Sequence, residues 1–159
     1  MPLTFNIRHL ENKEELHLEG EMPTEDLELD LHDEMIRPGP EVSYALEVQR
    51  LEGGALVQGS VRLPMEYTCV RCLKKFKRPL ELESWTVHLP LTGEDAVPVT
   101  NDLVNLTPYL REDTLLALPQ HPLCEAECRG LKIPAHLKEP EPAKKASAWD
   151  QLDKLKLKN

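Results

Sequence analysis

The chain has 159 residues, a net charge of −9 and 40% apolar residues, but only 4% aromatic ones. This length suits one domain of roughly 100 to 150 residues with a tail, and the composition predicts a core built mainly from Leu and Val. No apolar run approaches the roughly 18 residues that span a membrane, and residues 1–10 lack the pattern of a signal peptide. We therefore expect a cytoplasmic protein that does not engage a membrane.

The N-terminal part of the chain predicts strands. Residues 3–10 (LTFNIRHL) and 15–20 (ELHLEG) alternate partly between apolar and polar side chains, which is typical of strands with one buried face. We interpret these two segments as a first hairpin. Residues 26–32 (DLELDLH) alternate strictly and predict another exposed strand.

The next two segments form the clearest hairpin of the sequence. Residues 42–51 (VSYALEVQRL) and 55–63 (ALVQGSVRL) flank Gly53 and Gly54, and glycines adopt the positive φ angles that tight turns require. A further strand is expected over residues 79–91 (PLELESWTVHLPL). The pattern predicts a β-rich α+β domain, in which antiparallel hairpins form a sheet or a partly open barrel.

One main helix is predicted, from about Pro108 to Leu118. The Thr107 hydroxyl is placed to cap free backbone donors, Pro108 suits the first helical position, and Pro119 ends the run. The second half of this helix is apolar on nearly every side, which predicts that it packs against the sheet.

Three regions are expected along the chain. Residues 1–131 form the β-rich domain, and residues 132–147 are rich in Pro, Lys, Glu and Ala, which predicts a flexible linker. Residues 148–159 predict a short basic amphipathic tail that is too short for a stable isolated helix. This tail either docks on a surface or stays frayed.

Charge is distributed unevenly. Residues 1–66 hold 5 basic and 15 acidic side chains, whereas residues 67–88 hold 5 basic and 2 acidic ones. The five basic residues crowd around the first cysteine pair and are Arg71, Lys74, Lys75, Lys77 and Arg78. An acidic body with a local basic region is therefore expected.

The four cysteines form two short pairs, Cys69 with Cys72 and Cys124 with Cys128. Zinc prefers four soft or borderline ligands in a tetrahedron, and spacers of two or three residues let one turn direct two thiolates at one ion. The pattern predicts a structural Zn²⁺ site that staples distant parts of the domain together. Neighbouring basic residues such as Arg71 and Lys74 favour the thiolate form.

Other interpretations of the cysteines remain open. Disulfides are disfavoured in a chain without an export signal, and a redox CxxC normally opens a helix, whereas this one lies between strands. Buried free thiols are the main alternative to zinc. His121 and His136 lie near the second pair, and either would serve as a replacement ligand, although four cysteines already complete a site.

A series of short motifs lies within residues 69–131. They are Cys69-Val-Arg-Cys72-Leu73, Asp102-Leu103, Leu106-Thr-Pro-Tyr-Leu-Arg-Glu112, Leu115-Leu-Ala-Leu-Pro119, Pro122-Leu-Cys124 and Cys128-Arg-Gly-Leu131. In these motifs and their order the chain resembles the bacterial YceD family of ribosomal-RNA accumulation proteins. The chain departs from many members at Lys132-Ile-Pro-Ala-His136, where they carry a further Cys-Pro-x-Cys-Gly element. A second metal site is therefore not expected.

The resemblance implies a non-enzymatic role in the accumulation, processing or stability of large-subunit ribosomal RNA. Direct contact with ribosomal RNA or large-subunit assembly intermediates would use the basic residues 71–78 to neutralise phosphates. Phe76 would stack on a base there or, as its apolar character favours, lie in the core. The alternative is a zinc-stabilised adaptor whose acidic surface contacts a ribosomal protein or assembly factor.

Catalysis is not expected. The sequence holds no glycine-rich phosphate loop and no recognisable Ser/His/Asp or paired-carboxylate signature. A zinc ion with four thiolates has no open coordination position for water or substrate. No small-molecule substrate follows from this pattern.

Overall fold

The computed structural model describes residues 2–13, 15–132 and 134. In chain order the elements are β1 (Thr4–Asn6), α1 (Ile7–Asn12), β2 (Glu15–Pro23), the 3-10 helix η1 (Thr24–Leu27), β3 (Ile36–Pro38), β4 (Glu41–Leu51), β5 (Gly54–Leu63), β6 (Met65–Thr68), β7 (Lys75–Lys77), β8 (Leu80–Pro90), β9 (Val99–Thr100), β10 (Leu103–Asn105) and α2 (Thr107–Ala117).

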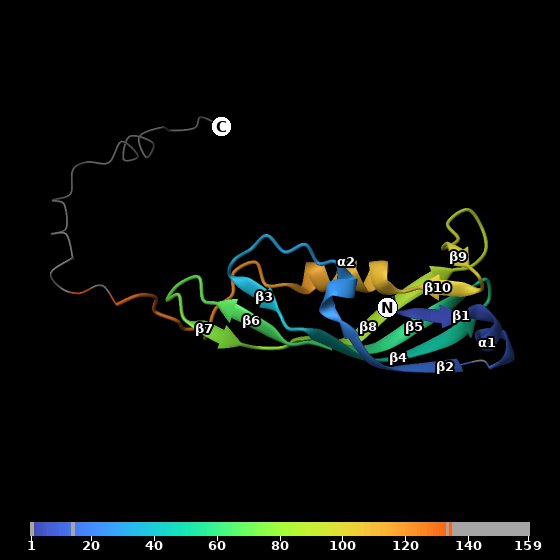
Figure 1. The fold of residues 1–159 in the computed structure, drawn as a ribbon, viewed down its shortest axis with the longest axis horizontal. Helices are drawn as coiled ribbons and strands as arrows, with labels where there is room; N and C mark the ends of the chain where they lie inside the picture. Colours follow the sequence, from blue (N-terminus) through green and yellow to red (C-terminus); the bar gives the residue numbers. More distant parts are fainter. Residues whose placement is uncertain (1, 14, 133, 135–159) are drawn as a thin grey trace, which may run out of the picture.

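The strands of this described part form three antiparallel sheets, with orders β2-β4-β5-β8, β3-β6-β7 and β1-β10-β9. None of these sheets closes into a barrel. Together with α2 as the main helix, they confirm the predicted β-rich α+β fold with antiparallel hairpins. The molecule is elongated, with β7 near one end and α1 near the other (Figure 1).

The four-stranded sheet contains the predicted central hairpin. β4 pairs with β5 from Ser43↔Arg62 to Leu51↔Gly54, and Gly53 in the turn has a φ of +76°. Inward-facing residues such as Val48 and Val57 are fully buried, while polar residues of the same strands face outward. The predicted strand over 79–91 is confirmed as β8, which pairs with β5.

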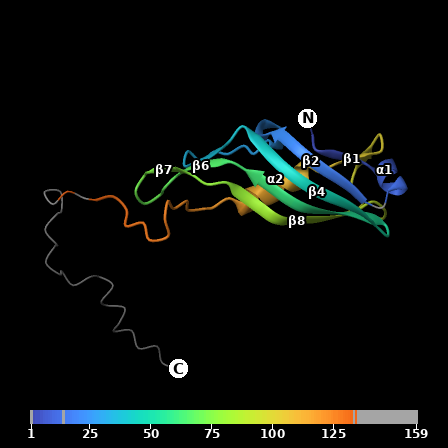
Figure 2. The same ribbon diagram turned by 90° about the horizontal axis from the view of Figure 1, so that it is seen from below.

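Helix α2 lies across one face of the four-stranded sheet (Figures 1 and 2). It buries Leu110 and Thr114, and the indole Nε1 of Trp85 on β8 donates a hydrogen bond of 2.6 Å to Asp113 Oδ2. The predicted helix is confirmed to within one residue. The expectation that its second half is covered is wrong at Leu116, whose side chain is 83% exposed.

The predicted N-cap role of Thr107 is also wrong. The Thr107 hydroxyl instead accepts a buried hydrogen bond from the Leu3 amide, 3.0 Å away, while the Thr107 amide donates to Asn105 Oδ1. Thr107 therefore ties the N-terminal strand to the start of the helix.

The predicted first hairpin does not form. β1 pairs with β10, and β2 pairs with β4. After Asn6 the chain turns into α1, where the Asn6 side chain accepts a hydrogen bond from the Arg8 amide and Leu10 is buried. Ile7 and Leu10 are three residues apart, which suits one face of a helix rather than one face of a strand.

The strand predicted over residues 26–32 is wrong as well. η1 ends at Leu27, and Glu28 and Asp30 have φ angles of 47° and 39°, so the backbone there is not extended. Leu27 and Leu29 are nevertheless both buried. The strict alternation thus comes from a loop in which left-handed residues separate two core leucines.

The predicted linker (132–147) and tail (148–159) lie outside the described residues, apart from Lys132 and Pro134. His136 lies outside them too. Among the described helices, none has the length and apolar character that crossing a membrane requires.

Candidate metal centre

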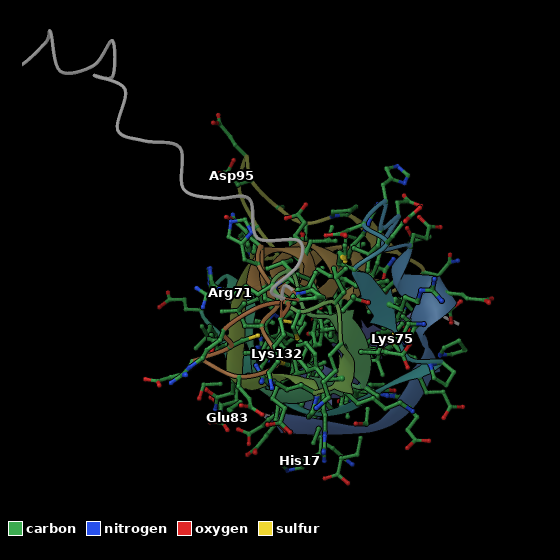
Figure 3. All side chains as sticks on the ribbon, turned by 90° about the vertical axis from the view of Figure 1, so that its left-hand side faces the viewer. His17, Arg71, Lys75, Glu83, Asp95 and Lys132 are labelled. Carbon is green, nitrogen blue, oxygen red and sulfur yellow. The ribbon has the colours of Figure 1, made fainter. Side chains whose placement is uncertain are left out.

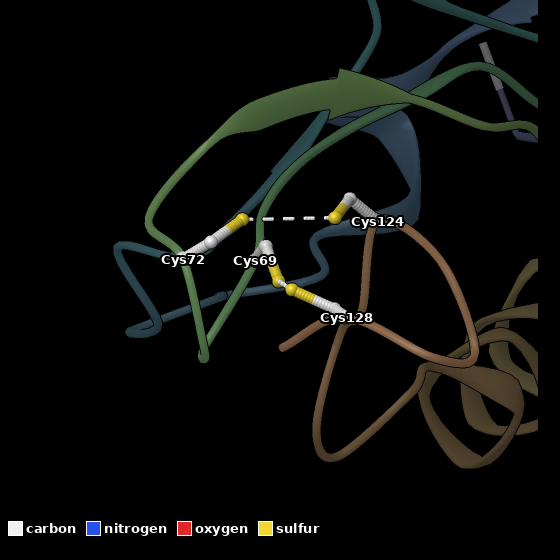
Figure 4. Close-up of side chains that lie close together, drawn as sticks. All are labelled: Cys69, Cys72, Cys124 and Cys128. Carbon is white, nitrogen blue, oxygen red and sulfur yellow. Dashed lines mark hydrogen bonds between the residues drawn. The ribbon is translucent and has the colours of Figure 1, made fainter. Parts of the chain in front are cut away.

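Two turns that are distant in sequence bring the cysteines together. Cys69 and Cys72 lie in the first cysteine turn (residues 69–74), which joins β6 to β7, and Cys124 and Cys128 lie in the second cysteine segment (residues 119–130), which follows α2 (Figure 4). The four sulfur atoms lie within 4.8 Å of one another. Cys69 is fully buried, and the other three cysteines are half-buried.

The spacing of the sulfur atoms suits a tetrahedral metal ion. Cys69 Sγ lies 3.8 Å from Cys128 Sγ, and Cys72 Sγ lies 3.6 Å from Cys124 Sγ. A metal–sulfur bond of about 2.3 Å places the thiolates of a regular tetrahedron about 3.8 Å apart. All four cysteines are free thiols, and each close pair joins one cysteine from each segment. The group is therefore able to hold a metal ion, with zinc and iron as the metals that four thiolates select.

Backbone hydrogen bonds shape the first cysteine turn. The Cys69 amide donates to the Lys74 carbonyl, and the Leu73 amide donates to the Cys69 carbonyl, both at 2.9 Å. Leu73 adopts a left-handed conformation with a φ of 60°. This tight reversal directs both thiols of the turn to the same side.

Further hydrogen bonds join the first turn to the second cysteine segment. The Val70 amide donates to the Pro122 carbonyl at 3.0 Å, and Arg71 Nη1 donates to the Cys128 carbonyl at 3.0 Å. Arg78 Nη2 lies 3.3 Å from the Cys124 carbonyl, to which it also donates. The two segments therefore approach each other through backbone contacts as well as through sulfur.

Crowding separates the pKa values of the thiols. The amides of Cys124 and Cys72 donate to Cys69 and lower the pKa of its thiol to about 6. Burial and the neighbouring Cys72 thiol raise the pKa of Cys124 to about 12. The amide of Gly130 acts to lower the pKa of Cys128, but burial and Cys72 raise it by more. A divalent cation at the centre would favour the thiolate form of all of them.

This arrangement argues against the redox interpretation. In a redox CxxC the attacking thiolate must be accessible. Cys69, whose pKa is low, has no exposed surface. Its thiolate is therefore placed to face the other three sulfur atoms rather than a partner in solution.

The five predicted nucleic-acid contacts divide into two groups. Arg71 and Arg78 donate hydrogen bonds to the second cysteine segment. The sequence does not predict these contacts, because charge alone does not identify an internal acceptor. Lys74, Lys75 and Lys77 are exposed, and their ammonium groups make no ion pair or hydrogen bond within the described part of the chain. Figure 3 shows the end of the molecule to which Arg71 and Lys75 belong.

The two remaining aromatic and histidine candidates lie beside the cysteines rather than among them. Phe76 stacks on Tyr67 with ring centroids 5.4 Å apart, and the Arg78 guanidinium lies over the Phe76 ring at 5.2 Å. Phe76 packs against the core, so its ring is already in contact with two side chains. His121 is not part of the cysteine cluster.

Comparison with known families agrees with the resemblance seen in the sequence. The model of a family described as "Large ribosomal RNA subunit accumulation protein YceD" matches residues 57–156. The chain belongs to the YceD family. The description of the family implies a role in the accumulation of large-subunit ribosomal RNA and names no enzymatic activity. Comparison with curated proteins and with solved structures finds no match.

The family match runs from β5 through the whole cysteine cluster. It therefore includes both cysteine segments and the basic residues between them, whereas β1 to β4 lie outside it. The family assignment thus rests on the part of the chain that forms the candidate metal centre.

Proposed function

We propose that this chain is a non-enzymatic cytoplasmic factor that binds large-subunit ribosomal RNA or its assembly intermediates. The observation that carries the proposal is the set of exposed lysines, Lys74, Lys75 and Lys77, beside the four-cysteine cluster in a member of the YceD family. Lysines without an internal partner are available to neutralise phosphates and release counterions. No small-molecule substrate is part of this function.

Zinc is the metal that we propose for the cluster, with Cys69, Cys72, Cys124 and Cys128 as ligands. In this role the ion holds residues 1–131 as one domain by fixing the first cysteine turn against the second cysteine segment, while 132–147 serve as a linker to the basic tail 148–159. Elemental analysis of the reduced protein tests the metal. One zinc per chain is expected, whereas iron would colour the protein and contradict the assignment.

The RNA interface is tested by a triple variant, Lys74→Gln, Lys75→Gln and Lys77→Gln. Binding to fragments of large-subunit ribosomal RNA is measured by filter retention at several salt concentrations. Loss of three phosphate contacts to single-stranded RNA should reduce the slope of log binding constant against log salt concentration by about 2. The three side chains are exposed, so the melting temperature should stay within about 2 °C of the original.

A matched control removes three charges at the opposite end of the molecule: Arg8→Gln, Lys13→Gln and Arg50→Gln. These positions are exposed and lie in or next to α1 or on β4. The control has the same net charge as the lysine variant and should keep the original salt slope. Equal losses in both variants would show a non-specific charge effect and contradict the proposed interface.

A protein-binding adaptor is the second candidate, and one observation favours it. The outward face of the four-stranded sheet carries more acidic than basic groups. Arg62, which pairs with Glu81, and His17 share it with exposed or half-buried carboxylates at Glu15, Glu19, Glu21, Glu47, Glu81 and Glu83. Such a face complements a basic ribosomal protein or assembly factor. Partners that stay bound after nuclease treatment, and are lost when these glutamates become glutamines, would favour the adaptor over the RNA-binding factor.

A further inference from the structure

A cavity of about 470 Å³ lies beside the cysteine cluster. Its walls come from β6 and β7, from the start of β8 and from the second cysteine segment, and include Tyr67, Phe76, Arg78, His121 and Pro122. Cavities of roughly 300 to 1,000 Å³ with mostly apolar walls and a few polar groups are typical of sites for small ligands. This one has aromatic and proline walls with a guanidinium and an imidazole.

A polar group of this cavity has no partner. Tyr67 is only 3% exposed, and its side chain contacts Phe76 by stacking but makes no hydrogen bond in the described part of the chain. In that part, two buried side-chain atoms lack a hydrogen-bond partner and are sealed from the surface, namely Thr24 Oγ1 and Arg111 Nε. The Tyr67 hydroxyl also lacks a partner but is not sealed, so it is open to the cavity that it lines. Because the hydroxyl faces this cavity without a partner from the described part of the chain, it is free to donate to an acceptor atom of a ligand there.

A phenol carries its proton at neutral pH, so the Tyr67 hydroxyl is available as a hydrogen-bond donor. A ligand in the cavity therefore needs a hydrogen-bond acceptor that reaches Tyr67. Flat apolar faces would match the aromatic and proline walls.

The charged groups indicate what is attached to such a ligand. Arg78 is fixed over Phe76 and by the Leu123 and Cys124 carbonyls, yet it remains exposed, and His121 is exposed beside it. Arg78 follows directly after Lys77 at the end of β7. A planar ring with acceptor atoms, joined to a negatively charged backbone, satisfies both the cavity and this rim.

We propose that this cavity takes an unpaired nucleobase of the bound RNA, with the Tyr67 hydroxyl donating to the base and Arg78 and His121 beside the adjoining phosphate. This inference rests on the proposed RNA-binding function and deepens it. Single-stranded RNA is recognised in this way because its bases are free to leave the stack and enter a pocket. Since Phe76 already contacts Tyr67 and Arg78, the base sits against this stack rather than replacing one of its members.

The cavity also depends on the cysteine cluster. Pro122 and Leu123, which line it, lie directly before Cys124, and the Pro122 carbonyl accepts the hydrogen bond from Val70. Release of a metal would free the second cysteine segment and remove one wall. Binding of the base should therefore be lost together with the metal, even though the lysines of β7 remain.

The test uses the full chain loaded with zinc and follows the Tyr67 and His121 side-chain resonances by NMR. The probes are adenosine and uridine 5′-monophosphate, with ribose 5-phosphate as the probe that has the charge but no base. We expect both nucleotides to shift these resonances and ribose 5-phosphate not to shift Tyr67. Tyr67→Phe, which keeps the ring, should weaken nucleotide binding about five-fold, as expected for one hydrogen bond. The matched variant Tyr44→Phe on β4 should leave binding unchanged.

Three other outcomes overturn the inference, and a fourth overturns the proposed RNA-binding function of the lysines instead. Equal shifts from ribose 5-phosphate would reduce the site to phosphate binding. Shifts from N-acetylphenylalaninamide without shifts from nucleotides would make it a protein-binding pocket. RNA binding that depends on Lys74, Lys75 and Lys77 but not on Tyr67 would overturn the cavity alone. If nucleotides shift the Tyr67 resonances but RNA binding is unchanged in the lysine variant, the proposed lysine interface alone would be overturned.

Discussion

Loss of the zinc ion that we propose for the cysteine cluster should remove a large share of the stability of the domain. The relevant perturbations are Cys72→Ser and treatment of the original protein with a strong chelator. Both remove the metal-mediated connection between the first cysteine turn and the second cysteine segment. The magnitude follows from the length of chain that this connection closes.

Cys72 and Cys124 are 52 residues apart. If the metal is treated as a cross-link, the chain-entropy relation for a closed loop of this length gives about 4 kcal/mol at 25 °C. A typical domain has a free energy of unfolding of about 5 to 15 kcal/mol, so this loss is severe. For a domain of this size it corresponds to a drop in melting temperature of about 8 to 16 °C.

Differential scanning calorimetry of reduced protein, with and without chelator, measures this drop. The original protein should melt at a lower temperature after chelation, and Cys72→Ser should melt near that temperature with or without chelator. The serine variant thereby separates loss of the metal from other effects of the chelator. An unchanged melting temperature, in protein shown by elemental analysis to have lost its zinc, would refute the cross-link argument.

Three further predictions concern the described residues. Cys124, with a pKa raised to about 12, is protonated at neutral pH and must lose its proton when a metal binds. The apparent zinc affinity, measured by competition titration, should therefore fall at least ten-fold per pH unit between pH 8 and 6. Gly59→Ala should lower the free energy of unfolding by about 3 kcal/mol in denaturant titrations, because its Cβ would lie 2.1 Å from a carbonyl oxygen of β4. The control Gly93→Ala meets no neighbouring atom and should lower it by only about 1 kcal/mol. Trp85→Phe should cost about 2 kcal/mol through the lost bond to Asp113, and a second change, Asp113→Ala, should add less than its own single effect.

The longer β-strands and the main helix could be predicted from the sequence because each has a local signal. The β4–β5 hairpin has glycines at its turn, and α2 lies between a proline at its start and another after its end. Strand partners were harder to predict, because β1 pairs with β10 nearly the whole domain away. The strand predicted from alternation over residues 26–32 was wrong for a similar reason. A loop with positive φ angles at Glu28 and Asp30 buries alternate residues there, as a strand would.

The candidate site shows the same division between local pattern and tertiary contact. The spacing of the cysteines was sufficient to predict that Cys69, Cys72, Cys124 and Cys128 meet, and the structure brings them within 4.8 Å. The hydroxyl of Tyr67 carried no such signal, because its cavity is formed by segments from both sides of α2.

The basic residues around the first cysteine turn fall into two groups by their contacts, and this division decides how the proposed metal site and the proposed RNA interface are coupled. Arg71 and Arg78 donate to carbonyls of the second cysteine segment, so their charge stays in place only while that segment does. Lys75 and Lys77 belong to β7, which is held by its pairing with β6 and does not need the metal directly. Loss of the metal should therefore leave the lysine-dependent salt slope largely intact while it removes the preference for unpaired bases. A shared loss of both properties would mean instead that β7 itself depends on the cysteine cluster.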